Sequence, residues 1–441
     1  MADYTAVRTP QDGTTSGWYE ILPAPAPARA LEEDLTADWV IVGAGFAGLS
    51  AARRLTQLRE GERIVVIDAQ RIAAGASGRN SGFMIDLPHE LKSHSYAGDL
   101  EPDRKQIRMN RAGIDYAREA VEAFGLGEHF NPCGKYHGAT DGNGLKALRG
   151  FEAHLEALGE PYTRLDAADM RRITGTEYYA GGTHTPGAVM IQPAAYIRGL
   201  AEGLKPKVSI FETSPVVKIE TGDGLTVHTP KGRVRTGNII LTVNGQVESF
   251  GLFRRRLMHV FTFASMTRVL TEAEQAALGG EAEWGLIPAD PMGSTIRRIR
   301  EGRIVVRNTF TYNPDMRSSQ AQIDGIGRRH DRSFRARFPM LGEVTMAYRW
   351  GGPLCLSLNS VPAFGEVETG VYVACCQNGL GTVKGTLAGK LIADLACGSN
   401  DPMVAEMLGY PAPKKLYPEP FMTLGARGRL WWMHRRAGRD L

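Results

Sequence analysis

The sequence predicts an α/β fold with a β-rich middle section, and two observations carry this prediction. Near the N-terminus a buried strand (Trp39–Val42), a glycine turn, a helix (Ala47–Leu58) and a second strand (Arg63–Asp68) follow within about thirty residues, which is a βαβ unit. In the last third, the strand Val371–Ala374, a glycine loop and a helix reaching Ala396 repeat the α/β pattern.

The remaining elements are predicted in chain order from periodicity and turn residues. Residues 1–36 contain Pro23, Pro25 and Pro27, which disfavour helix and sheet, so we expect an extended arm draped over the surface. Short β-rich runs separated by glycine turns fill Lys207–Val243. We expect helices near 103–124, 144–158, 193–204 and 316–337, and strands at 257–269 and 302–311.

Composition narrows the class of protein. The 441 residues are 43% hydrophobic and 23% charged, which is ordinary for a soluble globular chain, and no run of about 18 apolar residues predicts a membrane span. The five cysteines are odd in number and show no C-x-x-C spacing, so neither a disulfide framework nor a metal site is expected. A polar N-terminus without a secretory signal completes the prediction of a cytoplasmic protein.

Charge is concentrated at the C-terminus. The net charge is +4, and from Lys414 onwards seven Lys/Arg stand against two Asp/Glu, so the rest is nearly neutral and no nucleic-acid partner is expected. The tail Leu430–Arg436 has two interpretations. It contacts an anionic membrane surface, or, as we prefer, it is a helix that packs Trp431 or Trp432 on the body with its arginines outward.

The glycine turn Gly43-Ala44-Gly45-Phe46-Ala47-Gly48 predicts a dinucleotide site. It follows a strand and opens a helix, and Asp68 lies 20 residues beyond Gly48 at the end of the next strand. Gly43 permits the tight turn, Gly45 allows the backbone to approach a pyrophosphate, and Gly48 lets the helix pack on the strand. Asp68 would accept hydrogen bonds from a ribose. The other interpretation is a chance glycine turn.

Two further loops favour FAD over NAD. Gly75–Gly82 follows the second strand and is rich in glycine and serine, with Arg79 and Asn80 as polar anchors. Gly379–Gly381 precedes a helix whose N-terminus would stabilise negative charge on a reduced flavin. A mobile surface loop and a simple helix cap are the respective alternatives, and an NAD-dependent dehydrogenase is the alternative for the whole chain.

With these segments the chain resembles the FAD-dependent D-amino-acid oxidase superfamily, which includes the glycine and sarcosine oxidases, and within it enzymes of the gamma-glutamylputrescine oxidoreductase type. The resemblance rests on Val40–Ala52, Gly75–Gly82, Leu241–Gly245, Tyr348–Gly352, Val361–Gly365 and Asn378–Leu391. It implies an interleaved Rossmann-like FAD-binding domain (37–125, 181–250 and 345–400) and an antiparallel-sheet substrate domain, or cap (126–180 and 251–344). Residues 401–441 form a basic extension.

The resemblance and the loops together assign the cofactor residues. They are Gly43, Gly45, Phe46, Ala47, Gly48, Asp68, Ala69, Gly75, Ser77, Arg79, Asn80, Ser81, Gly82, Val217, Asn244, Gly245, Gly379, Leu380, Gly381 and Thr382. Sarcosine oxidases have a lysine after the C-terminal loop, where this chain has Val383 and then Lys384. They also link flavin through a cysteine, whereas Cys355 falls about three positions past that place, so we expect non-covalent FAD.

The implied reaction oxidises the C–N bond of a small-molecule amine or amino acid by hydride transfer to flavin N5, and the imine then hydrolyses. Oxygen is the expected acceptor, forming hydrogen peroxide, and a quinone or carrier protein is the alternative. A flavin that serves only structure is a further alternative.

Function then depends on residues that position the substrate. Arg297 is the first candidate to bind a substrate carboxylate, because the related enzymes have an arginine at this register, and Arg307 is the second. Trp350 is a candidate pocket wall or a core residue. Tyr136 with His137, and separately His259, are candidates to tune amine protonation or are structural residues.

Overall fold

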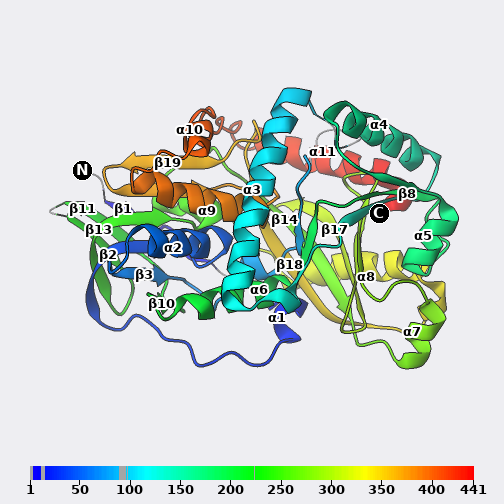
Figure 1. The fold of residues 1–441 in the computed structure, drawn as a ribbon, viewed down its shortest axis with the longest axis horizontal. Coiled ribbons are helices and arrows are strands. Elements are labelled where there is room, and N and C mark those ends of the chain that lie inside the picture. Colours follow the sequence, from blue (N-terminus) through cyan, green and yellow to red (C-terminus); the bar gives the residue numbers. More distant parts are fainter. Residues whose placement is uncertain (1–2, 11–14, 89–95, 97, 223) are drawn as a thin grey trace.

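Two large β-sheets, each covered by helices, organise the protein in a computed structural model that describes residues 3–10, 15–88, 96, 98–222 and 224–441. In Figure 1 the strands β2, β3, β10, β11 and β13 lie on the left, β14, β17 and β18 at the centre, and β8 on the right. The long helix α3 (Leu100–Phe124) stands between the two sides.

The first sheet of the described residues has nine strands, and its centre is parallel. In spatial order they are β1 (Tyr4–Thr5), β11 (Lys218–Gly222), β12 (Gly224–His228), β13 (Arg233–Leu241), β2 (Asp34–Val42), β3 (Ile64–Ile67) and β10 (Val208–Phe211), while β20 (Val371–Cys375) pairs with β13 and with β19 (Ala363–Glu368). Strand β2 pairs in parallel with β13 and β3, and β20 pairs in parallel with β13. The runs Val40–Val42 and Ile64–Ile67 are buried, as expected for strands covered on both faces.

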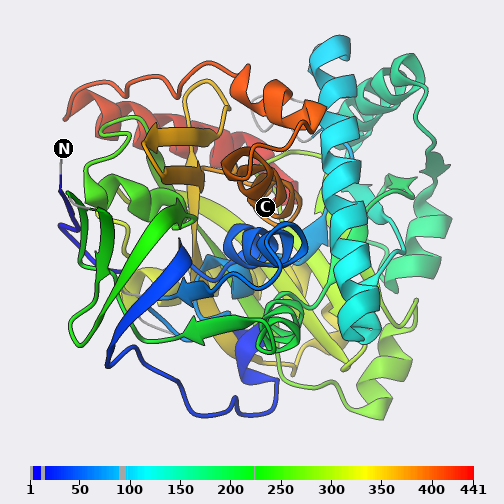
Figure 2. The same cartoon turned by 60° about the vertical axis from the view of Figure 1, so that its left-hand side comes forward.

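Helices from both ends of the chain cover this sheet together. Helix α2 (Phe46–Leu58) packs against α9 (Val383–Ala396), and a Cβ on Gly389 would lie 2.0 Å from the carbonyl oxygen of Ala47. Only glycine allows this approach. Figure 2 shows the cyan α3 alongside both helices, and α6 (Pro193–Leu204) packs against α2 and α3. The N-terminal and C-terminal α/β segments are therefore parts of one layer.

The second sheet has eight strands in the described chain. In order they are β18 (Met346–Leu356), β14 (Met258–Thr267), β17 (Arg303–Tyr312), β16 (Thr295–Ile299), β15 (Trp284–Pro288), β6 (Lys135–Ala139), β8 (Gly181–Thr185) and β7 (Thr163–Leu165). All neighbours are antiparallel except β15 and β6. A separate three-stranded sheet consists of β4 (Phe83–Met84), β9 (Val189–Ile191) and β5 (Phe130–Asn131).

Shorter helices cover the second sheet. Helix α8 (Gln320–Arg337) packs on β14, β17 and β18, helix α4 (Gly142–Leu158) on β6 and β8, and helix α11 (Phe421–Ala437) on β17. The remaining helices are α1 (Gly17–Glu20), α5 (Ala167–Thr174), α7 (Glu272–Leu278) and α10 (Pro402–Leu408). Within the described residues, none of the helices has the length and apolar character needed to cross a membrane.

The α/β class and the expected helices and strands are confirmed, and two segments differ from expectation. The predicted arm 1–36, of which residues 1–2 and 11–14 lie outside the description, is not merely draped over the surface. It contains β1 and α1, and Trp18 and Leu31 are each 1% exposed. Strands β8 and β18 lie in the second sheet, although the predicted FAD-binding segments 181–250 and 345–400 include them. The domain boundaries stay a prediction.

Candidate functional site

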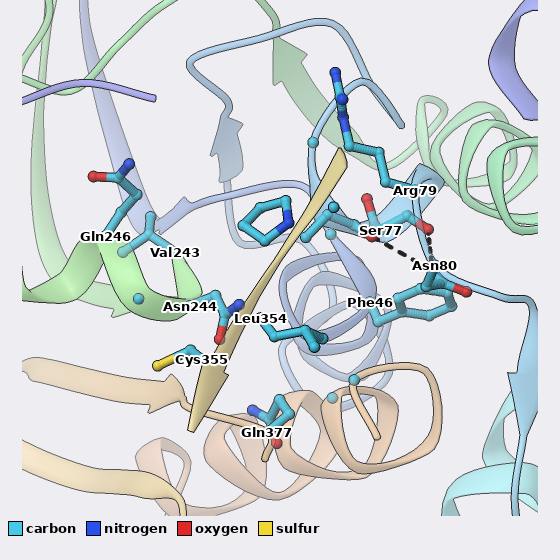
Figure 3. Close-up of a pocket in the computed structure, with 18 of the residues that line it drawn as sticks. Phe46, Ser77, Arg79, Asn80, Val243, Asn244, Gln246, Leu354, Cys355 and Gln377 are labelled. Carbon is cyan, nitrogen blue, oxygen red and sulfur yellow. Dashed lines mark hydrogen bonds between the residues drawn. The ribbon is translucent and has the colours of Figure 1, made fainter. Parts of the chain in front are cut away.

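A cavity of about 340 Å³ lies where the two sheets meet and brings together the three glycine-rich loops. Its lining includes the ends of β2, β3 and β13, the loop before α9, and the facing strands β14 and β18. Figure 3 shows Asn244, Leu354, Cys355 and Gln377 around it, opposite Phe46 and Ser77. The predicted cofactor segments thus converge from more than three hundred residues of sequence.

The first glycine loop has the geometry of a pyrophosphate site. Gly45 is the N-cap of α2 and no side chain caps the first turn, so backbone N–H groups are available beside the cavity. Gly43 has φ +102 and lines the cavity with Gly45, Phe46 and Ala47. Gly48 does not line it. A Cβ there would lie 1.8 Å from the carbonyl oxygen of Gly43, so Gly48 sets the close packing of α2 on β2.

Asp68 lies at the predicted ribose position. Its Oδ2 accepts from the backbone N–H of Ala44 at 2.7 Å and its Oδ1 from that of Gln70 at 2.8 Å. These bonds hold the carboxylate at the end of β3, beside the glycine loop, and a carboxylate can accept further hydrogen bonds. Asp68 and Ala69 both line the cavity.

The second loop, Gly75–Gly82, lines the cavity and is tied to the second sheet. Gly75, Ser77, Arg79, Asn80 and Ser81 belong to the lining, and Gly82 does not. Arg79 donates through Nε to Ala74 O and through Nη1 to Gly351 O, at 2.6 and 3.0 Å. Asn80 donates to Ser77 O at 2.6 Å (Figure 3). The predicted anchors therefore also shape the loop itself.

The third loop places a second helix N-terminus at the cavity. Gly379, Leu380, Gly381 and Thr382 all belong to the lining. Thr382, the N-cap of α9, donates its hydroxyl to Phe83 O at 2.6 Å and does not cap the helix. The N–H groups of Lys384 and Gly385 donate to Leu380 O and Gly381 O, so α9 contributes mainly the positive end of its dipole to the cavity. The side chain of Val383 is fully buried. In the described part of the chain, no lysine lines the cavity.

Two buried side-chain oxygens without a hydrogen-bond partner indicate that a polar cofactor fits the cavity. Asn244 and Gly245 line the cavity as predicted, together with Gln246. The side-chain oxygens of Asn244 and Gln246 are buried and have no hydrogen-bond partner, which is costly unless a ligand supplies donors. The uncapped helix ends, the fixed Asp68 and these acceptors together fit a dinucleotide. The predicted cofactor residue Val217 does not line the cavity, and its backbone N–H and C=O pair with His228 and Ala6. The preceding residues Pro215 and Val216 line the cavity instead.

Arg297 does not line the cavity. It is 3% exposed, and its Nη1 donates to the carbonyl oxygens of Ser81, Gly82 and Ile191 at 2.8–3.1 Å. A Cβ on Gly82 would lie 2.1 Å from that nitrogen. The prediction that Arg297 binds a substrate carboxylate is therefore corrected: its guanidinium holds the second loop against β9.

Arg307 is the predicted arginine that does reach the cavity. It comes from β17, opposite Thr295 of β16, and both line the cavity. Its Nε is buried without a hydrogen-bond partner, and its guanidinium carbon lies 4.5 Å from the centre of the Phe310 ring. It forms no salt bridge with any residue that the structure describes. Burial lowers the pKa of Arg307 to about 10, so it stays protonated at neutral pH.

The walls near Arg307 are mostly apolar. Tyr96 donates its hydroxyl to Pro288 O at 2.9 Å. The centre of the Phe310 ring lies 4.5 Å from the Arg307 guanidinium carbon, and Ala264 of β14 pairs with Arg307. The lining also includes the apolar residues Ile85, Ile287, Pro288 and Pro291. Asp68 is the one acidic residue on the described lining. Sequence reasoning missed these residues, although the apolar strand 257–269 that contains Ala264 was predicted.

Of the other predicted substrate residues, only His259 lines the cavity. Trp350 is 1% exposed and donates Nε1 to Arg79 O at 3.0 Å behind the second loop, so it is a core residue. Tyr136 packs on His184 with ring centres 4.9 Å apart, and neither it nor His137 lines the cavity. His259 does line it, with Nε2 2.8 Å from Glu248.

All five cysteines are free thiols in the structure, and the described residues contain no cluster of side chains that could hold a metal ion. Cys355 lines the cavity. The adjacent Cys376 thiol and burial raise the pKa of Cys355 well above its ordinary value, so the thiol stays protonated and is a poor nucleophile.

Comparisons with known proteins agree with this geometry. A family model described as FAD dependent oxidoreductase matches residues 38–395. Gamma-glutamylputrescine oxidoreductase of Escherichia coli (strain K12) is 27% identical over 420 residues, which are 91% of this chain and 94% of that protein. The crystal structure of glycine oxidase from Geobacillus kaustophilus has a TM-score of 0.71 at 18% identity and covers 87% of this chain and 100% of its own. That of L-proline dehydrogenase from P. horikoshii has a TM-score of 0.66 at 16% identity, covering 85% and 97%.

Proposed function

Because the chain belongs to the FAD-dependent oxidoreductase family, we propose that it oxidises the C–N bond of an amine or amino acid that carries a carboxylate. Arg307 carries this proposal, as a protonated guanidinium on a cavity whose one described acidic residue is Asp68, the residue predicted to bind the ribose. The gamma-glutamylputrescine oxidoreductase and glycine oxidase relatives support an amine or amino-acid substrate. Membership of this family removes the NAD-dependent alternative.

FAD would be held by the three loops, with Asp68 at the ribose and the N-termini of α2 and α9 at its charged parts. Bound there, FAD would be the oxidant that accepts a hydride from the C–H next to nitrogen. The protein's own task is to bind and orient. The guanidinium of Arg307 pairs with the substrate carboxylate through two parallel hydrogen bonds. The apolar walls hold the rest of the substrate and exclude water.

The composition of the lining indicates which kind of amine the cavity would bind. Because Asp68 is the one carboxylate on the described lining, an ammonium group bound beside Arg307 gains no ion pair from the rest of that lining, so the neutral amine needed for oxidation is the favoured bound form. The same absence disfavours a polyamine with several charges. An amino acid or N-substituted amino acid with an apolar remainder fits the charge and the walls best.

The substrate test is an anaerobic bleaching screen. The holoenzyme is mixed with glycine, sarcosine, D- and L-amino acids, gamma-glutamylated amines and polyamines, and flavin absorbance is followed. We expect bleaching by carboxylate-bearing amines and none by putrescine or spermidine. Bleaching by polyamines alone would overturn the carboxylate assignment, and no bleaching by any amine would indicate a flavin that serves only structure.

Oxygen as the electron acceptor, with hydrogen peroxide formed, stays our proposal. A quinone or carrier protein is the alternative acceptor, since no lysine lines the described part of the cavity. Stopped-flow reoxidation of the substrate-reduced enzyme by oxygen or by a soluble quinone decides between them. Fast reoxidation with stoichiometric peroxide supports an oxidase, whereas reoxidation by quinone alone identifies a dehydrogenase.

The free cysteines support a reducing, cytoplasmic compartment.

A further inference from the structure

Helix α11 near the C-terminus carries two apolar faces, and only one of them is used by the fold. Met422 and Ala437 are each 6% exposed. Ala437 belongs to a small core with Val260, Met292 and Phe310, against which Leu430 and Met433 pack. Nε2 of His434 accepts from the backbone N–H of Phe310 at 3.0 Å. This face fixes α11 to the second sheet behind the cavity wall.

The opposite face exposes large apolar side chains to solvent. Phe421 is 70% exposed, Leu424 66%, Trp431 61% and Trp432 55%. At about 100° per residue these four side chains fall within roughly 100° of one another around the helix axis. This arrangement corrects the sequence expectation that Trp431 or Trp432 packs on the body.

Arginines lie in and beside this aromatic face. Arg427, Arg429, Arg435 and Arg436 are all exposed, and the helix contains no acidic residue. The guanidinium carbons of Arg435 and Arg436 lie 5.2 and 5.1 Å from the ring centres of Trp431 and Trp432. Arg427 and Arg429 form no ion pair with any residue of the described chain.

We propose that this face of α11 binds the surface of a membrane rich in anionic lipids. Tryptophan and phenylalanine enter the boundary between headgroups and acyl chains, while arginines pair with lipid phosphates. Arg436 pairs with Asp290, but the face keeps a net positive charge from Arg427, Arg429 and Arg435. This charge favours an anionic membrane over a second copy of the chain, since a two-fold contact would place like charges together. An aromatic face without acids and flanked by arginines has the composition of a helix that lies in the membrane plane.

The test is co-sedimentation of the holoenzyme with vesicles. One set is pure phosphatidylcholine, and the other contains about one quarter phosphatidylglycerol. We expect binding to the anionic vesicles only, and release by high salt. Arg427→Glu with Arg429→Glu should weaken binding by at least about twenty-five-fold, from about fivefold for each arginine. Trp431→Ser with Trp432→Ser should abolish it.

Controls separate surface binding from damage to the fold. Val269→Ser removes a side chain that is 48% exposed at another place on the surface, and it should bind vesicles as wild type does. All variants should keep their flavin and their rate of flavin reduction, because none of these residues lines the cavity. Equal binding to both vesicle types, no binding to either, or a wild-type dimer in light scattering that the tryptophan variant abolishes would overturn the proposal.

Discussion

At the residue scale, two arginines on neighbouring strands have different roles because of their position along the sheet. Thr295 pairs with Arg307 and Arg297 with Val305, so all four side chains share one face. Arg297 lies two residues from Thr295, about 7 Å along the strand. That distance moves its guanidinium from the cavity to the carbonyls of the second loop. Both arginines were recognised in the sequence, but not which one lines the cavity.

The pH dependence of catalysis tests Arg307. For a carboxylate-bearing amine, kcat/KM should rise with pH as the substrate amine loses its proton and fall above about pH 10, where Arg307 loses its own. Arg307→Ala should raise KM at neutral pH by at least about tenfold, the low end for one lost charge-assisted pair, and remove the falling limb. Arg300→Ala, an exposed arginine paired with Glu283, is the matched control. An unchanged falling limb in the Arg307 variant would remove this residue from the site.

Arg297 should act on cofactor retention and stability. Replacing it with methionine leaves three buried carbonyl oxygens without their charged donor, which costs about 2–4 kcal/mol in the free energy of unfolding. We expect a lower Tm and a weaker affinity for FAD, with KM unchanged in the fraction that retains flavin. Flavin titration of the apoprotein and thermal unfolding measure both. A raised KM with normal flavin affinity would restore the original assignment to the substrate.

At the element scale, close backbone packing decides how the helices meet the first sheet. Gly48 packs α2 on β2, and Gly389 packs α9 on α2. The fingerprint G-x-G-x-x-G predicted the first contact from spacing alone. The contact at Gly389 was not predictable, because it joins elements more than three hundred residues apart and no motif marks it.

Gly48→Ala tests this packing. Its Cβ would overlap the carbonyl oxygen of Gly43 at 1.8 Å, so the glycine loop must shift and lose its fit to the pyrophosphate. We expect at least a tenfold loss of FAD affinity, measured by fluorescence titration. Gly142→Ala is the control, since nothing lies within 4 Å of a Cβ there. Equal effects of the two substitutions would show that the contact at Gly48 is unimportant.

At the scale of the whole molecule, the cavity is lined by both sheets, so the cofactor should link their stability. The glycine loops come from the first sheet, and β14 and β18 from the second. A ligand that bridges two layers stabilises both by mass action. For the linked stability of the two sheets, this shared wall matters more than the predicted domain boundaries. Strand β18 contributes Gly352–Cys355 to it.

Removal and return of FAD tests this linkage. The apoprotein should unfold at a lower Tm, and FAD at about one hundred times its Kd should restore about 2.7 kcal/mol of stability in one transition. Because the Cys355 thiol stays protonated, acid precipitation should release all the yellow colour into the supernatant. Colour that stays with the precipitate would contradict non-covalent binding, and a Tm insensitive to FAD would contradict the linkage.

The sequence by itself determined the α/β class, the three glycine-rich loops of the cavity and the carboxylate of Asp68 beside the first of them. These features depend on local spacing, since a glycine turn between strand and helix has the same geometry wherever it occurs. The tertiary structure alone decided that Arg307, not Arg297, faces the cavity, that Trp350 is core, and that the aromatic face of α11 points to solvent. Each of these depends on the direction of a side chain relative to distant elements, and periodicity along one strand or helix does not specify which neighbour covers which face.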